Sequence, residues 1–109
     1  MANNLKGLHG LALYIYTDIH DRADTHPIKS KELELKYNVS GVKVREAIAE
    51  LRKKYKQPIC SGSTGYYFAR TRAMWDRTKA QLLSRAKELR DAANNPDEYF
   101  YDSEQSKLF

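Results

Sequence analysis

Basic side chains in the middle of the chain have the chemistry and the spacing to bind a polyanion. Arg45 and Arg52 lie seven positions apart, and Lys43 lies on the neighbouring stripe of the same expected helix. Guanidinium and ammonium groups match the acceptors of guanine and the oxygens of phosphate. A net charge of +5 and a pI near 9.3 also favour a polyanionic partner. The alternative is a solvated helix face, which Glu46 and Glu50 favour because carboxylates repel phosphate.

Hydroxyl groups on both sides of this segment add further candidates. Ser40 precedes the expected helix and can cap it. Ser61, Ser63 and Thr64 lie in a glycine-containing turn, where their hydroxyls can donate to phosphates. Alternatively, this turn belongs to a hairpin that only covers the core. The residues that we expect to contact DNA are Ser40, Lys43, Arg45, Arg52, Lys53, Ser61, Ser63 and Thr64.

The residue types that commonly carry catalysis or bind metals do not form a recognisable site. Cys60 is the single cysteine, so it lacks a partner for an internal disulfide, and we expect it to be a half-buried apolar residue in a strand. His9, His20 and His26 are spaced too irregularly for a zinc site. The sequence contains neither a nucleophile motif nor a glycine-rich phosphate loop. We therefore expect a protein that is not an enzyme and that uses no cofactor or metal.

The elements that must position these side chains begin with two helices. From 4 to 22, apolar residues recur at three- and four-residue steps, which indicates an amphipathic helix. Pro27 stops this helix because proline cannot continue it, and Ile28 is expected in a very short strand. Ser30 is expected to cap a second, brief helix over 31–37.

A tight turn separates this brief helix from the helix that carries the basic residues. Asn38 tolerates the left-handed conformation in which many helices end. Val44, Ile48 and Leu51 share one face of the following helix, which is expected to reach Tyr55. Two capped helices around a tight turn make a helix-turn-helix.

A hairpin, a long helix and a tail complete the predicted order. Residues 59–60 and 66–69 flank the turn 61–65 as a hairpin, and 71–93 is helical. Residues 96–109 form an acidic tail, which is expected to be flexible. The predicted fold class is mostly α with a small β-hairpin wing, organised as a winged helix-turn-helix over 1–69, a C-terminal helix over 70–95 and the tail over 96–109.

This order of features resembles a known family over roughly residues 5 to 69. The S-K-E-L at 30–33, the turn and helix at 39–48 and the G-Y-Y at 65–67 are similar to the winged-helix domains of small phage and prophage proteins, and to the N-terminal domain of biotin ligase-repressors. The resemblance implies that 43–55 is a recognition helix, with its N-terminal residues facing base edges in the major groove. Gly41 departs from the family, which more often has a polar residue there, so one possible DNA contact is missing.

The long helix has two interpretations. Trp75, Leu82 and Leu89 recur every seven residues, which resembles a short coiled-coil seam. These side chains can pair with a second copy of the chain, or pack back on the first helix. We favour a homodimer, because a helix of this length carries more apolar surface than one partner helix easily covers.

The last residues resemble a docking peptide. Gln105, Leu108 and Phe109 match the Q-x-x-L-F motif by which bacterial replication and repair proteins bind the sliding clamp. The motif implies hydrogen bonds from Gln105 and an apolar pocket for the other two side chains. Alternatively, Leu108 and Phe109 fold onto the domain or stay in solvent.

The predicted function is binding of double-stranded DNA by a phage- or prophage-type regulator of transcription, or by a replication-associated factor. The alternative is a protein-interaction module that uses the winged helix as a scaffold and binds a host protein such as the sliding clamp. No apolar run approaches the roughly 20 residues that span a bilayer, and the N-terminus lacks the apolar block of a signal peptide. We therefore expect a cytoplasmic protein without a membrane partner.

Overall fold

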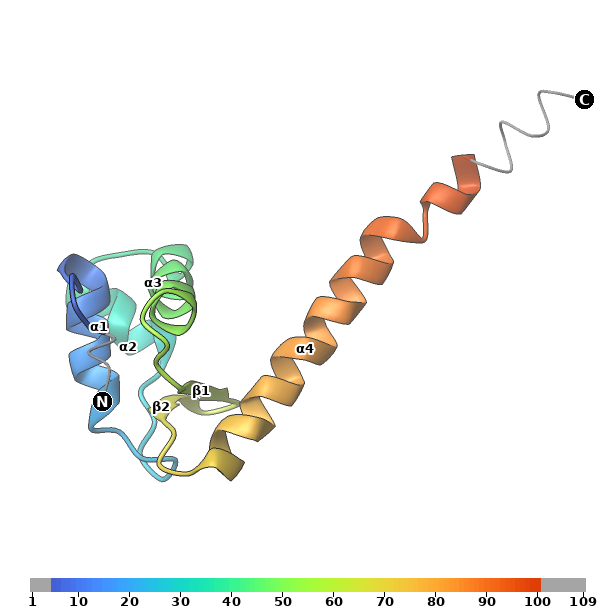
Figure 1. Cartoon of the computed structure of the whole chain (residues 1–109). Helices are drawn as coiled ribbons and strands as arrows, with labels where there is room; N and C mark the ends of the chain where they lie inside the picture. The colour runs from blue at the N-terminus through green and yellow to red at the C-terminus, as the bar shows by residue number, and fades with distance from the viewer. Residues whose placement is uncertain (1–4, 101–109) are drawn as a thin grey trace, which may run out of the picture. The chain divides into compact units, whose positions relative to one another are not determined.

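The computed structural model describes residues 5–100 of the chain, which form two compact units, one reaching to Thr78 and one beginning at Lys79. Figure 1 shows the elements in chain order. They are α1 (Gly10–His20), α2 (Ser30–Tyr37), α3 (Gly41–Lys53), β1 (Ile59–Gly62), β2 (Gly65–Phe68) and α4 (Arg72–Asn94). The predicted fold class, mostly helical with a small hairpin and a long C-terminal helix, is confirmed.

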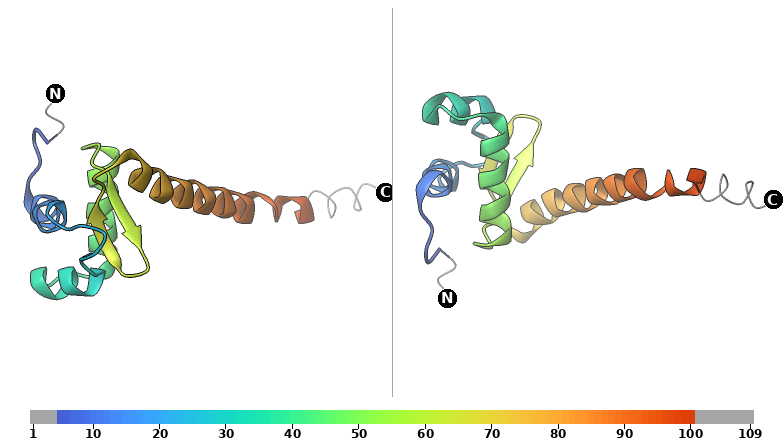
Figure 2. Two further views of the ribbon diagram at one scale, coloured as in Figure 1. Left: turned by 90° about the horizontal axis from the view of Figure 1, so that it is seen from below. Right: turned by 90° about the horizontal axis from the view of Figure 1, so that it is seen from above.

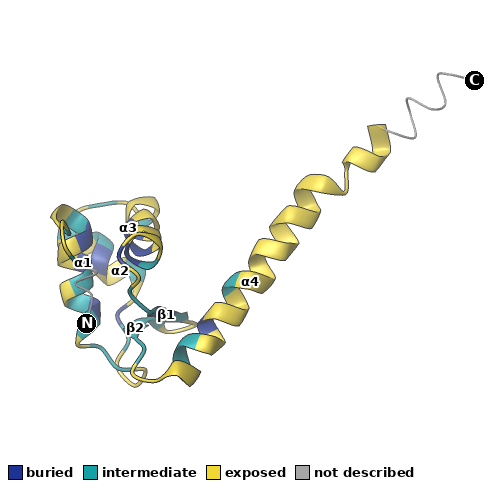
Figure 3. Ribbon diagram, viewed as in Figure 1, coloured by how far each residue is buried: buried dark blue, intermediate teal, exposed yellow. Residues whose placement is uncertain are grey.

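The core of the first unit lies between α1, α2, α3 and the hairpin. Its buried members come from every one of these elements, and Figure 3 shows them on the inward sides of the helices. They are Ala12, Ile15, Ile19, Ile28, Leu33, Val44, Ala47, Ile48, Leu51, Tyr55 and Ile59. The expected inward face of α3 is therefore confirmed, and it forms because apolar residues at three- and four-residue steps share one side of a helix.

The first helix is shorter than the predicted span 4–22. It begins at Gly10, and His9 before it is extended, with φ of −154° and ψ of 173°. Glycines at 7 and 10 weaken the helix at this point, because glycine is a poor helix former. Leu5 and Leu8 nevertheless pack against the core from a turn, so their apolar character was a correct sign of burial.

The ends of α2 and α3 test the predicted caps. Lys29 occupies the N-cap position of α2, and Ser30 is already the first residue of the helix. The Oγ of Ser30 donates to Oε2 of Glu34 at 3.0 Å. The prediction that Ser30 caps this helix is therefore wrong. Asn38 is left-handed, with φ of 53° and ψ of 52°, as predicted. Ser40 caps α3 as predicted, because its Oγ accepts from the backbone N–H of Lys43 at 3.3 Å.

The hairpin differs in detail from its prediction. β1 and β2 pair antiparallel from Ile59↔Phe68 to Gly62↔Gly65, which leaves a two-residue turn. β1 is thus two residues longer than predicted, β2 keeps the predicted length but begins one residue earlier, and the tip is shorter than 61–65. Ile28 pairs with Tyr66 as a single bridge, which confirms the very short strand.

The long helix α4 begins in the first unit. Cys60 of β1 is completely buried, rather than half-buried, and its Sγ lies 3.6 Å from the carbonyl oxygen of Met74. Thr78 is buried as well. In the second unit, residues 97–100 form a further helical turn where a flexible tail was predicted. Within the described range, no helix is both long and apolar enough to cross a membrane.

Candidate nucleic-acid interface

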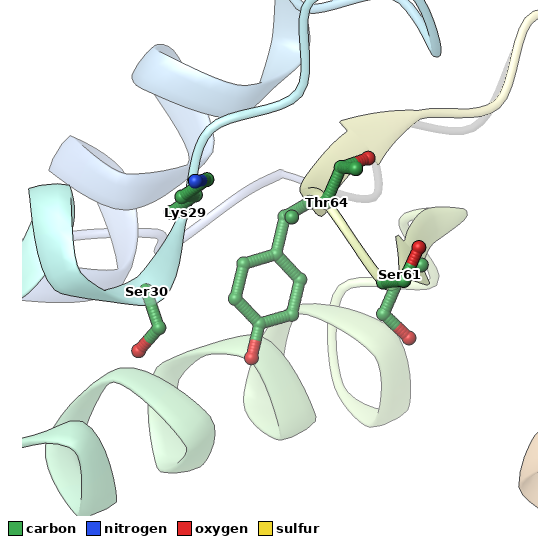
Figure 4. A pocket seen from close by; sticks show the side chains of 8 residues that line it. Lys29, Ser30, Ser61 and Thr64 are labelled. Atoms are coloured by element: carbon green, nitrogen blue, oxygen red, sulfur yellow. The ribbon is translucent and has the colours of Figure 1, made fainter.

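A hollow of about 320 Å³ lies between the start of α2 and the hairpin. Figure 4 shows Lys29 and Ser30 on one side of it, with Ser61 and Thr64 on the other. Its lining residues are Lys29, Ser30, Ser61, Gly62, Ser63, Thr64, Gly65 and Tyr66. Among these eight residues there is one ammonium group and several hydroxyls but no carboxylate, so the lining can donate hydrogen bonds to an anion.

Backbone pairing between two distant segments builds this hollow. The N–H of Ile28 donates to the oxygen of Tyr66, and the N–H of Tyr66 donates to the oxygen of Ile28, both at 2.8 Å. Gly65 makes this approach possible, because it has φ of 136° and a Cβ there would lie 2.6 Å from the oxygen of Ile28. Lys29 is therefore held beside the hairpin by its neighbour in the chain.

The turn of the hairpin carries two of the predicted contact residues. Ser63 and Thr64 are exposed and occupy the two positions between the strands. Both residues line the hollow, and the hydroxyl of each can donate to a phosphate oxygen. Ser61 is half-buried in β1 and accepts a hydrogen bond from Arg52.

Arg52 is placed differently from its prediction as an outward DNA contact. Its side chain is half-buried, and its Nε donates to the carbonyl oxygen of Ile59 at 2.9 Å. Its Nη2 lies 3.4 Å from the Oγ of Ser61. The views from below and above in Figure 2 show α3 and the hairpin side by side. Arg52 therefore connects α3 to β1.

Lys43 lies on the side of α3 that faces the start of α1. Together with Glu46 and Glu50 it lines a second hollow, of about 270 Å³, whose other wall includes His9 and Leu11. The ammonium of Lys43 lies 3.6 Å from Oε2 of Glu46, and both side chains are more than half exposed. Glu46 and Glu50, whose carboxylates disfavour phosphate binding, thus lie on the same side of α3 as Lys43. Arg52 lies on the side of α3 that faces the hairpin.

The remaining predicted contacts on α3 are exposed. Arg45 lies one turn after Gly41, and Lys53 is the last residue of the helix. Ser40 uses a lone pair for the cap of α3, and its O–H group can still donate to a phosphate. The structure therefore brings Ser40, Arg45 and Lys53 to the surface as predicted.

No protein-family model matches this chain, and neither a curated protein nor a solved structure matches it.

The positive charge of the chain is concentrated in two segments. Residues 29–56 contain nine lysine and arginine side chains and four acidic ones, and residues 70–93 contain seven basic and three acidic ones. The first 28 and the last 16 residues each contain more acidic than basic side chains. The segment 29–56, which includes α2 and α3, thus carries an excess of five positive charges. This partition is visible in the sequence, and Lys29 is the first residue of the more basic segment.

Five of the eight lining residues of the hollow were not predicted as contacts, among them Lys29 and Ser30. Lys29 and Ser30 precede or begin a short helix, and their spacing alone gives no sign that they lie beside a turn more than 30 residues later. The signal that was available is Gly65 before an aromatic residue, because a glycine inside a strand often marks a close backbone approach.

The other predicted surfaces involve residues of α4 and of the end of the chain. Trp75 is half-buried in the first unit, beside Pro58 and Ala69. In the second unit Leu82 is half-buried, and Leu89 has 65% of its surface exposed. The predicted clamp-binding residues Gln105, Leu108 and Phe109 lie outside the described residues.

Proposed function

We propose that this protein binds double-stranded DNA, with α3 in the major groove and the tip of the hairpin against the sugar-phosphate backbone. One observation carries the proposal. Exposed donors from three separate elements, namely Lys29 before α2, Arg45 on α3 and the turn at Ser63 and Thr64, are attached to one shared core. An anion with regularly spaced charges can engage donors of all three elements together, whereas a small anion reaches only neighbouring donors, such as those that line the hollow.

The chemistry of each element supports this arrangement. The N-terminal residues of a recognition helix face base edges, and α3 presents Arg45 in its second turn. Lys29 and the hydroxyls of the hairpin turn suit phosphate oxygens, which fix the register of a protein on a duplex without reading its sequence. A role as a regulator or replication-associated factor of phage or prophage type belongs to this proposal and rests on the resemblance to winged-helix domains. A cytoplasmic location belongs to it as well, and rests on the lack of a membrane-length apolar run and of a signal-peptide pattern in the sequence.

Salt dependence of binding to a duplex tests the proposal. If about four lysine and arginine side chains neutralise phosphates, the logarithm of the binding constant should fall with the logarithm of salt concentration with a slope of about −3.6. Replacing Lys29 with alanine should reduce the magnitude of this slope by about one, because one phosphate contact is lost. The measurement is fluorescence anisotropy of a labelled duplex over a range of salt concentrations.

Lys36→Gln is the matched control for Lys29→Ala. It removes the same charge from the other end of α2, where the ammonium lies 2.8 Å from Asp18 of α1, and the amide keeps a donor for that contact. We expect the slope of this variant to equal that of the parent. A parent that fails to bind duplex at low salt, or whose binding is insensitive to salt, contradicts the proposal.

A further inference from the structure

An exposed valine lies at the beginning of α3. Val42 is the second residue of the helix and has 53% of its surface exposed, whereas Val44, Ile48 and Leu51 are at most 2% exposed. Within α3, all of which the structure describes, it is the one large apolar residue that is exposed. Valine is β-branched and a poor helix former, so neither the core nor the helix requires it at this position.

The neighbours of Val42 make this end of α3 chemically distinctive. Val42, Arg45 and Ala49 are separated by three and four residues, so they follow one stripe of the helix, and all three are exposed. The Nη1 of Arg45 lies 3.3 Å from the position that a Cβ on Gly41 would occupy. The guanidinium therefore extends back over the first turn, toward the end of the helix that carries Val42.

An apolar group and a guanidinium at one helix end match two features of the major groove. Thymine presents its C5-methyl group there, and guanine presents N7 and O6, which accept from a guanidinium. The side chain of Val42 has no donor, so a phosphate cannot recognise it, whereas an apolar contact with a methyl group can. The small side chain of Ala49 leaves space for bases to approach the helix one turn further on.

We infer that Val42 is a specificity-determining residue that contacts the methyl group of a thymine close to a guanine bound by Arg45. This inference rests on the proposed function, because it requires α3 to enter the major groove. It specifies, beyond the proposed function, the kind of DNA base sequence that the protein recognises. The preferred duplex contains a thymine within about two base pairs of a guanine, since successive turns of a helix contact neighbouring base pairs in the groove.

Deoxyuridine in place of thymine tests this inference, because the exchange removes the methyl group alone. Duplexes that bind the full chain are first selected from a random library, and each thymine close to the selected guanine is then replaced. We expect the parent to lose about fourfold in affinity at one such thymine, the effect of withdrawing one methyl group from an apolar contact. Val42→Ser should bind more weakly than the parent and should change less than twofold on the same replacement.

Leu35→Ser is the matched control, because Leu35 is 75% exposed on α2 and is not part of α3. It should retain the fourfold loss of the parent. A parent that binds duplex in a salt-dependent manner but is indifferent to deoxyuridine overturns the role of Val42 and leaves the proposed function intact. The role of Val42 is likewise overturned if Val42→Ser still loses about fourfold in affinity when the thymine is replaced by deoxyuridine. A parent that binds no duplex overturns both.

Discussion

Arg52 of α3 donates from Nε to the carbonyl oxygen of Ile59 in β1 at 2.9 Å. The bond joins the last full turn of α3 to the first residue of the hairpin, and the Nη2 of Arg52 extends the contact to Ser61. A half-buried guanidinium with these partners serves to fix the direction of the hairpin relative to α3. The distance between Arg45 on α3 and the hydroxyls of the turn depends on that direction.

Replacing Arg52 with lysine separates this positioning role from a charge contact with DNA. Lysine keeps the positive charge but lacks the Nε–H at the required position and the planar fork, so the bond to Ile59 is lost. We expect Arg52→Lys to lower the free energy of unfolding by about 1 kcal/mol and to increase amide hydrogen exchange in β1 and β2. Chemical denaturation and hydrogen-exchange mass spectrometry measure the two effects.

Lys53→Ala is the control for Arg52→Lys, because Lys53 is the adjacent basic residue and is exposed. It should leave hydrogen exchange in the hairpin unchanged while weakening DNA binding modestly. If Arg52→Lys has the stability and the exchange pattern of the parent, then Arg52 acts through its charge and the positioning role is wrong.

Gly65 should tolerate no side chain. Gly65→Ala would place a Cβ 2.6 Å from the oxygen of Ile28, in a backbone conformation with φ of 136° that alanine rarely adopts. We expect a loss of about 1–3 kcal/mol in the free energy of unfolding, with weaker DNA binding because Lys29 moves away from the turn. Gly62→Ala is the comparison, since the nearest atom to its Cβ, apart from the adjacent residues, would be a ring carbon of Tyr67 at 4.0 Å. Equal melting temperatures of the two variants would contradict the prediction.

Local patterns predicted the parts of the fold that local chemistry determines. The inward face of α3, the left-handed Asn38 and the cap at Ser40 each depend on residues within one or two helical turns, and each is confirmed. The boundary of α1 was wrong because the leucines ahead of it are apolar without being helical. Apolar spacing reports which residues are buried, and it cannot distinguish a helix from a turn that packs on the same core.

The candidate interface was predictable only in part, for a similar physical reason. Helical periodicity shows that Arg45 and Arg52 share a stripe, but it does not show what lies against that stripe. The hairpin reaches Arg52 and leaves Arg45 exposed, because the hairpin packs near the end of α3. Lys29 was missed because its place beside the turn depends on the backbone pairing of Ile28 with Tyr66. Contacts between segments so far apart in sequence have no local signature.

Tyr37 should stabilise the contact between α1 and α2 in a pH-dependent manner. Its hydroxyl donates to Oδ2 of Asp18, and Lys36 donates to Oδ1 of the same carboxylate at 2.8 Å. Burial and then the hydrogen bond to Asp18 raise the pKa of Tyr37 above its usual value near 10. Tyr37→Phe should therefore lower the free energy of unfolding by about 1 kcal/mol at neutral pH, through loss of this bond.

The pH window follows from the direction of the shift in pKa. Folding favours the protonated phenol, so the contribution of Tyr37 is complete below pH 10 and declines as the pH rises through the higher pKa of the folded state. The difference in stability between the parent and Tyr37→Phe should be constant from about pH 6 to 9 and should shrink above about pH 10. Tyr14→Phe is the control, because Tyr14 is exposed and stacks on Tyr37 through its ring. A difference that persists unchanged above pH 10 contradicts this assignment.

The heptad positions of the second unit should mediate a homodimer. Leu82 and Leu89 are seven residues apart and so lie on one line of α4, and Leu89 is 65% exposed. Leu83 is similarly exposed, at 60%, but lies about 100° around the helix from Leu82. We expect the double variant Leu82→Gln, Leu89→Gln to be a folded monomer, and Leu83→Gln to remain a dimer like the parent. Light scattering coupled to size-exclusion chromatography at high micromolar concentration measures this, with circular dichroism to verify that α4 stays helical. If the parent is a monomer at that concentration, or if Leu83→Gln is as monomeric as the double variant, then Leu82 and Leu89 do not form a specific dimer seam.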